Sequence, residues 1–324
     1  MSYSLTAISQ TAKFPKGKYD EIIKYLDILP TRLVSFSNLS PEKAVDFQLD
    51  IDLSKTGFEG TPKEDIIEKV ESTIKKTIKE NSIDGVDLVF QKITAARKHK
   101  KLIVFDMDST LIYQEVIEMI AALADVEAEV EAITTRAMNG ELDFKQSLAS
   151  RCALLKGIES SNLWESLKPR LKITNGAKEL CQAMKASGCK LAVCSGGFLP
   201  LANYIKEQLG LDYAFANVLK TEVNEKGVEV LSGVTVGDIV DGSRKRQLLL
   251  QLAEENKIDI ANTVAIGDGA NDLLMMGAAG FGIAWNAKPK VQKEAPGCLN
   301  SDSLKDVLYI FGYNDVEIEN LLKH

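Results

Sequence analysis

The chain has 324 residues, 45% of them hydrophobic, and its formal net charge is −7. This length predicts roughly two domains of ordinary size, and the hydrophobic content is enough for a sizeable core. The acidic balance argues against a nucleic-acid partner, because proteins that bind the phosphate backbone need a basic face.

The first 95 residues follow the pattern of a small α+β domain. Strand-like runs and helical stretches occur in the order β-α-β-β-α-β, the split βαβ arrangement, and this order resembles ferredoxin-like and ACT-type domains. The strand-like runs are 3–9, 32–36, 45–53 and 86–93, and the helical stretches are 19–29 and 64–79. The basic segment A-A-R-K-H-K-K that follows, at 95–101, is interpreted as a solvated linker.

From residue 101 onward, short apolar runs end in small or acidic residues. The runs are L-I-V-F before D-M-D-S-T, K-L-A-V-C before S-G-G-F, T-V-A-I before G-D-G-A-N-D, and F-G-I-A-W before N-A-K-P-K. Helical patterns between them predict a parallel sheet that is covered on both faces. Because ligands bind at the carboxyl ends of such strands, we expect the first three polar segments at one edge of the sheet.

The stretch from residue 113 to 185 is helical in pattern and rich in Ala, Glu and Leu. It is long enough for a four-helix cap over the strand ends, which would exclude water and complete a pocket. The expected domains are therefore an α+β domain over 1–95, a catalytic core over 96–112 and 186–324, and a cap over 113–185.

The motif D-M-D-S-T raises the question of why two carboxylates follow a buried strand. Asp106 and Asp108 share a direction if the extended conformation continues through Met107, and such a pair repels unless a cation or a shared proton lies between them. The third strand-end motif, G-D-G-A-N-D, adds Asp268 and Asp272. With a backbone carbonyl and waters, Asp106, Asp268 and Asp272 would form an oxygen-only site, which selects Mg²⁺ rather than zinc.

Magnesium beside a free carboxylate, a hydroxyl and glycine-rich backbone suits phosphoryl transfer. None of the five cysteines is followed six positions later by arginine, as a cysteine phosphatase requires, and no G-x-x-x-x-G-K-[ST] motif exists. The two histidines, His99 and His324, cannot build a zinc cluster or a Ser-His-Asp triad, and they exclude a histidine phosphatase. An aspartate nucleophile is what the sequence leaves.

Four segments together carry a family resemblance. In this order, D-M-D-S-T, S-G-G-F, Lys245 and G-D-G-A-N-D resemble the four motifs of the haloacid dehalogenase (HAD) superfamily, over residues 101 to 324. The resemblance implies a Rossmann-like parallel sheet with a helical-bundle cap. It makes Asp106 the nucleophile that becomes an aspartyl phosphate, and Asp108 the general acid and base.

The same resemblance assigns the other motif residues. Ser195 and Lys245 would be catalytic as well, Ser195 by bonding a phosphoryl oxygen together with the amides of Gly196 and Gly197. Asp272 would orient the water shell of the metal. The metal ligands would be Asp106, Asp108 and Asp268. Taken alone, Lys245 in S-R-K-R is an ordinary solvated charge, and Ser195 is an ordinary turn residue.

The cap sequence narrows the resemblance. Q-E-V-I-E and E-A-I-T-T-R-A-M-N-G-E-L-D-F-K-Q-S-L-A-S-R closely resemble phosphoserine phosphatases, and Y-Q-E-V-I-E-M-I-A-A is similar to the fungal members. The resemblance implies that Glu115 binds the substrate ammonium, Arg151 binds its carboxylate, Phe144 packs in the lid and Asn271 contacts the phosphate. A zwitterionic amino acid needs such an anion and such a planar cation. Without the resemblance, Glu115 and Arg151 are ordinary surface charges.

The expected activity is Mg²⁺-dependent hydrolysis of O-phospho-L-serine to L-serine and phosphate, the last step of L-serine biosynthesis. Three alternatives stay open: phosphotransfer from phosphoserine to another hydroxyl, hydrolysis of another small phosphomonoester, and a non-catalytic regulatory protein on this fold. The N-terminal domain would either mediate homodimerisation, as a scaffold, or sense serine.

The remaining sequence features indicate a cytoplasmic protein. The N-terminus M-S-Y-S-L-T-A-I-S-Q has no basic start and no apolar run of signal-peptide length, and no stretch of about 18 apolar residues exists to span a membrane. The five cysteines are odd in number and irregularly spaced, which fits reduced thiols better than disulfides. No membrane partner is expected.

Overall fold

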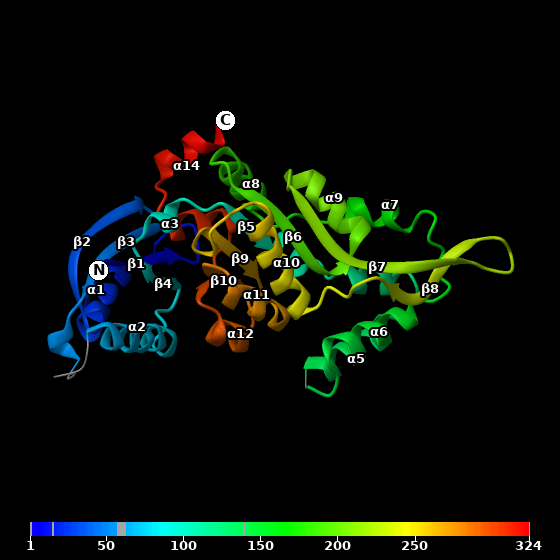
Figure 1. Cartoon of the computed structure of the whole chain (residues 1–324), viewed down its shortest axis with the longest axis horizontal. Helices are drawn as coiled ribbons and strands as arrows, with labels where there is room; N and C mark the ends of the chain where they lie inside the picture. Colours follow the sequence, from blue (N-terminus) through cyan, green and yellow to red (C-terminus); the bar gives the residue numbers. More distant parts are fainter. Residues whose placement is uncertain (1, 15, 57–62, 139, 324) are drawn as a thin grey trace.

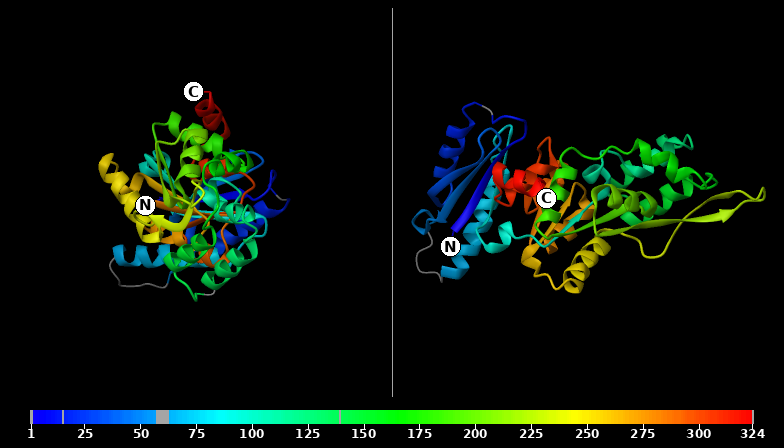
Figure 2. Two further views of the ribbon diagram at one scale, coloured as in Figure 1. Left: turned by 90° about the vertical axis from the view of Figure 1, so that its right-hand side faces the viewer. Right: turned by 90° about the horizontal axis from the view of Figure 1, so that it is seen from above.

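The computed structural model describes residues 2–14, 16–56, 63–138 and 140–323. Three parts follow one another along its long axis (Figure 1): an N-terminal domain, a central sheet with helices on both faces, and a group of helices beside a long hairpin. The view from above shows the same order (Figure 2). The expected α/β core with an added α+β domain is confirmed.

The N-terminal domain is a four-stranded antiparallel sheet in the order β2-β3-β1-β4, with two helices on one face. Its elements are β1 (Ser2–Ser9), α1 (Lys18–Ile28), β2 (Thr31–Ser40), β3 (Ala44–Ile51), α2 (Lys63–Glu80) and β4 (Val86–Lys92), with a short 3₁₀ turn at Leu53–Lys55. The predicted β-α-β-β-α-β order is therefore confirmed. Ile22 on α1 and Ile74 on α2 pack against Phe47 and Leu49 of the sheet and form a small core of their own.

The segment at 95–101 differs from the solvated linker that its charges predict. It forms the short helix α3 (Ala95–Lys98), and two of its cations, Arg97 and Lys100, are buried. The Arg97 guanidinium donates two hydrogen bonds of 2.8 Å to the Asp46 carboxylate and one of 3.2 Å to the Ile310 carbonyl oxygen. The reason is that the second face of the N-terminal sheet carries an acidic group, which needs a cation once the core covers that face.

Arg97→Met is expected to lower the free energy of unfolding by roughly 3–5 kcal/mol, because it leaves the Asp46 carboxylate buried without its cation. Urea denaturation measures the change. The matched control is Lys98→Met, which removes an ion pair to Glu317 whose side chains are 38% and 39% exposed. The control should cost no more than about 1 kcal/mol. Equal losses in both variants would contradict the structural role of Arg97.

The central sheet has seven strands in the order β11-β10-β9-β5-β6-β7-β8. All neighbouring pairs are parallel except β7 and β8, which form an antiparallel hairpin. The strands are β5 (Leu102–Phe105), β6 (Lys190–Phe198), β7 (Tyr213–Val223), β8 (Glu229–Val236), β9 (Thr263–Gly267), β10 (Phe281–Trp285) and β11 (Gly297–Leu299). The four apolar runs are thus strands β5, β6, β9 and β10, whereas β7, β8 and β11 were not among the predicted strands.

Side chains of β5 alternate between two separate hydrophobic cores. Leu102 and Val104 pack with the helices of one face, and Ile103 and Phe105 with those of the other. The first face is covered by α10 (Gly242–Glu255), α11 (Leu273–Ala278) and α12 (Pro289–Glu294). The second is covered by α8 (Ala177–Ala186), α9 (Leu199–Leu209), α13 (Val307–Ile310) and α14 (Asp315–Leu322). This double coverage explains why the strand is a continuous apolar run.

The cap contains α4 (Val116–Ala122), α5 (Glu127–Met138), α6 (Phe144–Leu154) and α7 (Leu163–Leu167). The hairpin supports it, because α6 packs on β8 and the Gly157 amide donates to the Leu231 carbonyl oxygen at 2.8 Å. Helix α8 instead packs against β6, α9 and α14. We therefore propose that the cap ends near Ile173, which bridges back to Ile112, rather than at residue 185.

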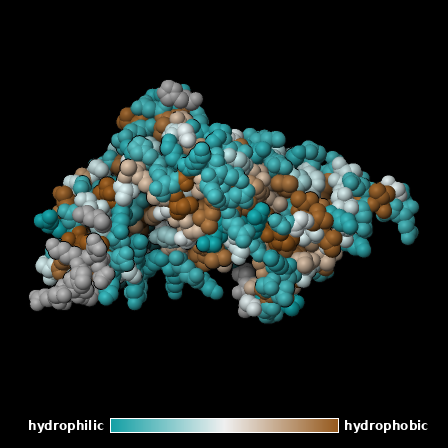
Figure 3. Space-filling view, in the orientation of Figure 1, coloured by the Kyte–Doolittle hydropathy of each residue, from teal (hydrophilic) through white to brown (hydrophobic). Residues whose placement is uncertain are grey.

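The surface in Figure 3 is largely hydrophilic, with hydrophobic residues in several separate patches. Among the described residues, no helix combines the length and the apolar character that crossing a bilayer requires.

Candidate active site

A cavity of about 770 Å³ lies where the carboxyl ends of β5, β6 and β9 meet the cap. The predicted convergence of three polar segments at one edge of the sheet is confirmed by its lining. Site residues at its wall are Asp106, Asp108, Glu115, Phe144, Arg151, Gly196, Gly197, Asp268 and Asn271. Asn271 follows β9, at the N-terminal side of α11. Ser195 and Lys245 are fully buried, and each contacts a carboxylate that lines the cavity. Ser195 contacts Asp108, and Lys245 contacts Asp106.

Asp106 is fixed at the end of β5 by its neighbours. Its backbone amide donates to the Ile266 carbonyl oxygen at 2.8 Å, which ties it to β9. Its Oδ1 accepts hydrogen bonds from the Met107 amide at 2.7 Å and from the Lys245 ammonium at 2.8 Å. Among the described residues nothing donates to Oδ2. That oxygen is left to react with a molecule in the cavity.

Lys245 lies on the buried side of α10 and links two carboxylates. Its Nζ is 2.8 Å from Asp106 Oδ1 and 2.7 Å from Asp272 Oδ1, and its side chain is 0% exposed. Burial alone would lower the pKa of this lysine, but the two carboxylates raise it above its usual value. Lys245 is therefore a fixed positive charge beside Asp106, and not the solvated charge that S-R-K-R suggests by itself.

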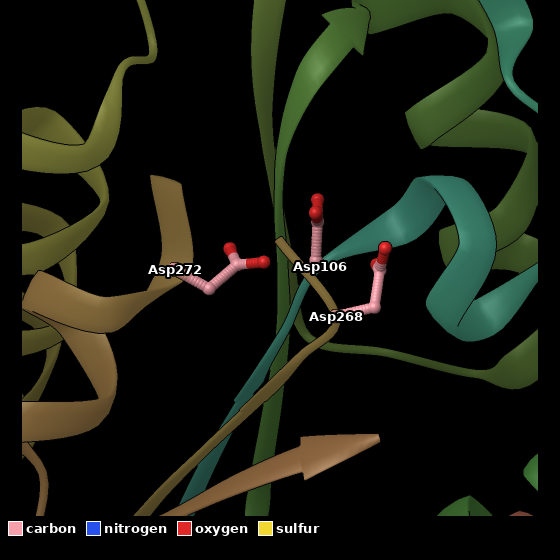
Figure 4. A group of neighbouring side chains, drawn as sticks. All are labelled: Asp106, Asp268 and Asp272. Carbon is pink, nitrogen blue, oxygen red and sulfur yellow. The ribbon is translucent and has the colours of Figure 1, made fainter. Parts of the chain in front are cut away.

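Three carboxylates, Asp106, Asp268 and Asp272, each place an oxygen within 4.8 Å of the other two. In Figure 4, Asp106 and Asp268 point in the same direction, and Asp272 points toward Asp106 from the side. Burial, followed by repulsion from Asp106, raises the pKa of Asp268 to about 8. One lysine does not balance three clustered carboxylates, two of them buried, so the donor set fits a divalent cation bound through oxygen ligands.

Asp108 lies apart from these three carboxylates. After the extended Asp106 the chain turns irregularly through Met107–Leu111, where Asp108 (φ −63°, ψ 135°) and Ser109 (φ 54°, ψ 5°) leave helical geometry, so the extended conformation does not continue through Met107. Asp108 Oδ1 accepts from the Val116 amide at 3.2 Å, and Ser195 Oγ lies 3.4 Å from Oδ2. Burial and then the charge of Glu115 raise the pKa of Asp108 well above its usual value. These surroundings favour the protonated, neutral form of the Asp108 carboxyl group.

The S-G-G motif follows the apolar part of β6 and needs glycine at its third position. A Cβ at Gly197 would lie 2.7 Å from Asp108 Oδ2 and 3.0 Å from Ser195 Oγ. The Gly197 amide donates to Ser195 Oγ at 2.8 Å, which orients the hydroxyl. The serine hydroxyl and the glycine backbone thus lie next to the carboxyl group of Asp108.

Glu115 and Arg151 both face the cavity from the cap side. Glu115 Oε1 accepts from Ser109 Oγ at 2.7 Å, and its pKa is raised, first by burial. The Arg151 Nε donates to the Ser147 carbonyl oxygen at 3.3 Å, but its guanidinium forms no ion pair with any described residue. An acid and an unpaired arginine thus lie at the wall of a partly buried pocket.

The cap closes over the strand ends through two contacts. The Phe144 ring lies so near Gly196 that a Cβ added there would be 2.9 Å from it. Lys145 Nζ is 3.3 Å from Asp241 Oδ2, at the N-terminus of α10. Phe144 and Lys145 begin α6, so the start of this helix makes both contacts.

Residues 100–280 match the family model of the haloacid dehalogenase-like hydrolases. The chain is also 44% identical, over 318 residues, to the phosphoserine phosphatase of Saccharomyces cerevisiae, and the match covers 98% of both chains. The chain belongs to the phosphoserine phosphatase family of HAD-like hydrolases. The resemblance to this family, including its fungal members, is confirmed, and the chain is a phosphatase.

Solved structures of the HAD family agree with the fold. A HAD family hydrolase from Salmonella enterica serovar Typhi covers 96% of this chain and 99% of its own, with a TM-score of 0.72 and 28% identity. A structure described as a phospho-aspartyl intermediate analogue of phosphoserine phosphatase covers 65% of this chain and 99% of its own, with a TM-score of 0.59 and 43% identity.

Four residues of this HAD site were not predicted from the sequence. Thr110 Oγ1 donates to Asp268 Oδ1 at 2.9 Å, and Ser109, at φ +54°, turns the chain so that Asp108 and Glu115 face one cavity. Asp241 caps α10 and holds Lys145. Ser147 lines the cavity with a buried hydroxyl that has no hydrogen-bond partner among the described residues. The S-T after D-M-D was a usable signal for Ser109 and Thr110, but nothing local marked Ser147.

Proposed function

We propose that this protein hydrolyses O-phospho-L-serine to L-serine and phosphate, the last step of L-serine biosynthesis, through an aspartyl phosphate on Asp106. The observation that carries the proposal is that one cavity brings two pairs of residues together. The first pair is Asp106, which is bound to Lys245, and Asp108, whose pKa is raised. The second pair is Glu115 and the unpaired Arg151. The first pair suits phosphoryl transfer, and the second suits a zwitterionic amino acid.

The metal is proposed to be Mg²⁺, held by Asp106, Asp268 and a backbone oxygen of Asp108. The carboxylate of Asp108 is engaged by Val116 and Ser195, so we assign its ligand role to the main chain. Asp272, which accepts from Lys245 and from the Gly269 amide at 3.0 Å, would orient metal-bound waters. When bound, the ion supplies positive charge that neutralises the phosphoryl oxygens.

In the first half of the reaction, Asp106 Oδ2 forms a bond to phosphorus while the bond from phosphorus to the serine oxygen breaks. Asp108 donates its proton to that leaving oxygen, which its raised pKa permits. Ser195 and the Gly196 amide hold phosphoryl oxygens, with Asn271 beside them, while the Gly197 amide keeps the Ser195 hydroxyl in place. In the second half, Asp108 takes a proton from water, the water oxygen bonds to phosphorus, and the bond to Asp106 breaks.

Phosphate release should depend on both metal and substrate chemistry. With Mg²⁺, kcat/KM for phosphoserine is expected to exceed that for p-nitrophenyl phosphate by about 10³-fold or more, since two charge-assisted contacts contribute about 2–3 kcal/mol each. EDTA should abolish both activities, and added Mg²⁺ should restore them. Comparable rates on both substrates would keep the aspartate mechanism but overturn Glu115 and Arg151 as the selecting residues. Equal amounts of serine and phosphate are expected, since transfer to another hydroxyl would leave phosphate short.

We also propose that the N-terminal domain is a dimerisation scaffold, because β2 is an edge strand that exposes Leu33, Val34 and Phe36. Analytical ultracentrifugation would reveal a monomer if the proposal is wrong. A cytoplasmic location is proposed as well, supported by five cysteines that are all free.

A further inference from the structure

Lys100 is a buried cation at the joint between the N-terminal domain and the core. Its residue is only 3% exposed, and its ammonium lies 5.7 Å from the centre of the Phe311 ring. Among the described residues it forms no ion pair and donates no hydrogen bond. A contact with an aromatic ring compensates only part of the cost of burying an ammonium group.

Lys100 is one of the residues that line a cavity of about 330 Å³. This joint cavity is bounded by the N-terminal domain on one side, through Tyr3, Glu71, Lys75 and Lys92, and by Phe281 of the core on the other. Its volume lies at the lower end of the roughly 300–1,000 Å³ that is usual for small-molecule sites.

The charges around the joint cavity do not balance. Arg97 is neutralised by Asp46, and Lys92 by Glu71 at 2.9 Å. Lys75 and Lys100 then remain as cations that form no ion pair with a described residue. The lining therefore carries an excess of positive charge, and Lys100 is the more buried of its two cations without an ion pair.

The neighbouring cavity between α2, β4 and α12 provides a contrast. Its buried carboxylate, Asp87, is already saturated, because the Asn300 side chain and the Gln10 side chain donate to Oδ1 at 2.8 and 3.0 Å and the Asn300 amide donates to Oδ2. The buried carboxylate of that cavity therefore has its partners, whereas Lys100 at the joint cavity has no ion-pair or hydrogen-bond partner among the described residues.

We propose that the joint cavity binds a small molecule carrying a phosphate or carboxylate group, with the Lys100 ammonium as its main contact. The anion would complete the hydrogen bonds of Lys100 and draw Lys75 inward as a second cation. Burial lowers the pKa of Lys100 to about 8, so the side chain is still mostly protonated at neutral pH and attracts an anion. The site is separate from the catalytic cavity, with which it shares no lining residue.

Isothermal titration calorimetry of the full chain, without Mg²⁺, tests the proposal with inorganic phosphate and with acetate as probes. The Ser195→Ala background weakens phosphate binding at the catalytic cavity. In this background, the further substitution Lys100→Met should weaken binding of the probe by about tenfold or more, because a charge-assisted contact is lost. The matched Lys101→Met, which removes the same charge from an exposed neighbour, should change nothing. Binding of phosphate alone indicates a phosphate-bearing ligand, binding of acetate alone indicates a carboxylate, and binding of both indicates either group.

A second measurement uses the unsubstituted protein and so does not depend on the folding of a variant. The bound probe should slow acetylation of Lys100 by acetic anhydride, followed by peptide mass spectrometry, and leave Lys101 unaffected. Phosphoserine turnover by Lys100→Met should equal that of the parent chain. Binding of neither probe, equal binding by Lys100→Met, or unprotected Lys100 would overturn the proposal.

Discussion

Asp106→Asn is expected to lower kcat for phosphoserine by roughly 10⁴-fold or more, the loss usual when a covalent nucleophile is removed. The amide is nearly the same size as the carboxylate and can still accept from Met107 and Lys245, so the fold should persist. What is lost is the Oδ2 electron pair that attacks phosphorus, together with one metal ligand. Phosphate release measures the rate, and borohydride reduction of the quenched enzyme, followed by peptide mass spectrometry, detects the aspartyl phosphate.

The control separates loss of the nucleophile from loss of charge in general. Asp238→Asn removes an exposed aspartate whose contact with Arg244 is 3.6 Å long, on the same side of the core. It should retain full activity and form the aspartyl phosphate. A labelled peptide other than the one containing residue 106, or an Asp106→Asn enzyme that keeps a tenth of its rate, would refute the proposed mechanism.

The edge of the sheet that carries the site could be predicted from the sequence, because each of its polar segments directly follows its own strand in the chain. β5, β6 and β9 are buried on both faces, so they appear as apolar runs, and the polar groups follow directly in the chain. Parallel topology then brings the three ends together without any further information. Family resemblance added Lys245, whose surroundings in S-R-K-R give no hint that its side chain is buried.

The parts that the sequence did not predict depend on distant contacts. Arg97 was expected in solvent, but Asp46 and the Ile310 carbonyl oxygen, which lie far from it in the chain, bury it. The hairpin of β7 and β8 projects from the sheet and is only partly covered, so its strands lack a continuous apolar run. The turn after Asp106 depends on the left-handed conformation of Ser109, which serine adopts rarely and no local pattern announces.

Arg151→Ala is expected to lower kcat/KM for phosphoserine by about 10³-fold, because a buried charge pair is worth roughly 2–5 kcal/mol when one partner is removed. The guanidinium is partly buried and has no protein carboxylate within ion-pair distance among the described residues, so the substrate carboxylate would be its partner. Hydrolysis of p-nitrophenyl phosphate, which has no such carboxylate, should change by less than about threefold. Steady-state kinetics on the two substrates gives the comparison.

Two variants decide whether the loss is specific. Arg136→Ala removes an exposed cap arginine that pairs with Glu141, and it should leave both substrates unaffected. Arg151→Lys keeps the charge but loses the planar pair of donors, so it should recover only part of the phosphoserine activity. Equal losses on both substrates in Arg151→Ala would mean that the arginine supports cap closure and not the substrate carboxylate. In that case selectivity would have to come from Glu115, whose residue also lines the cavity.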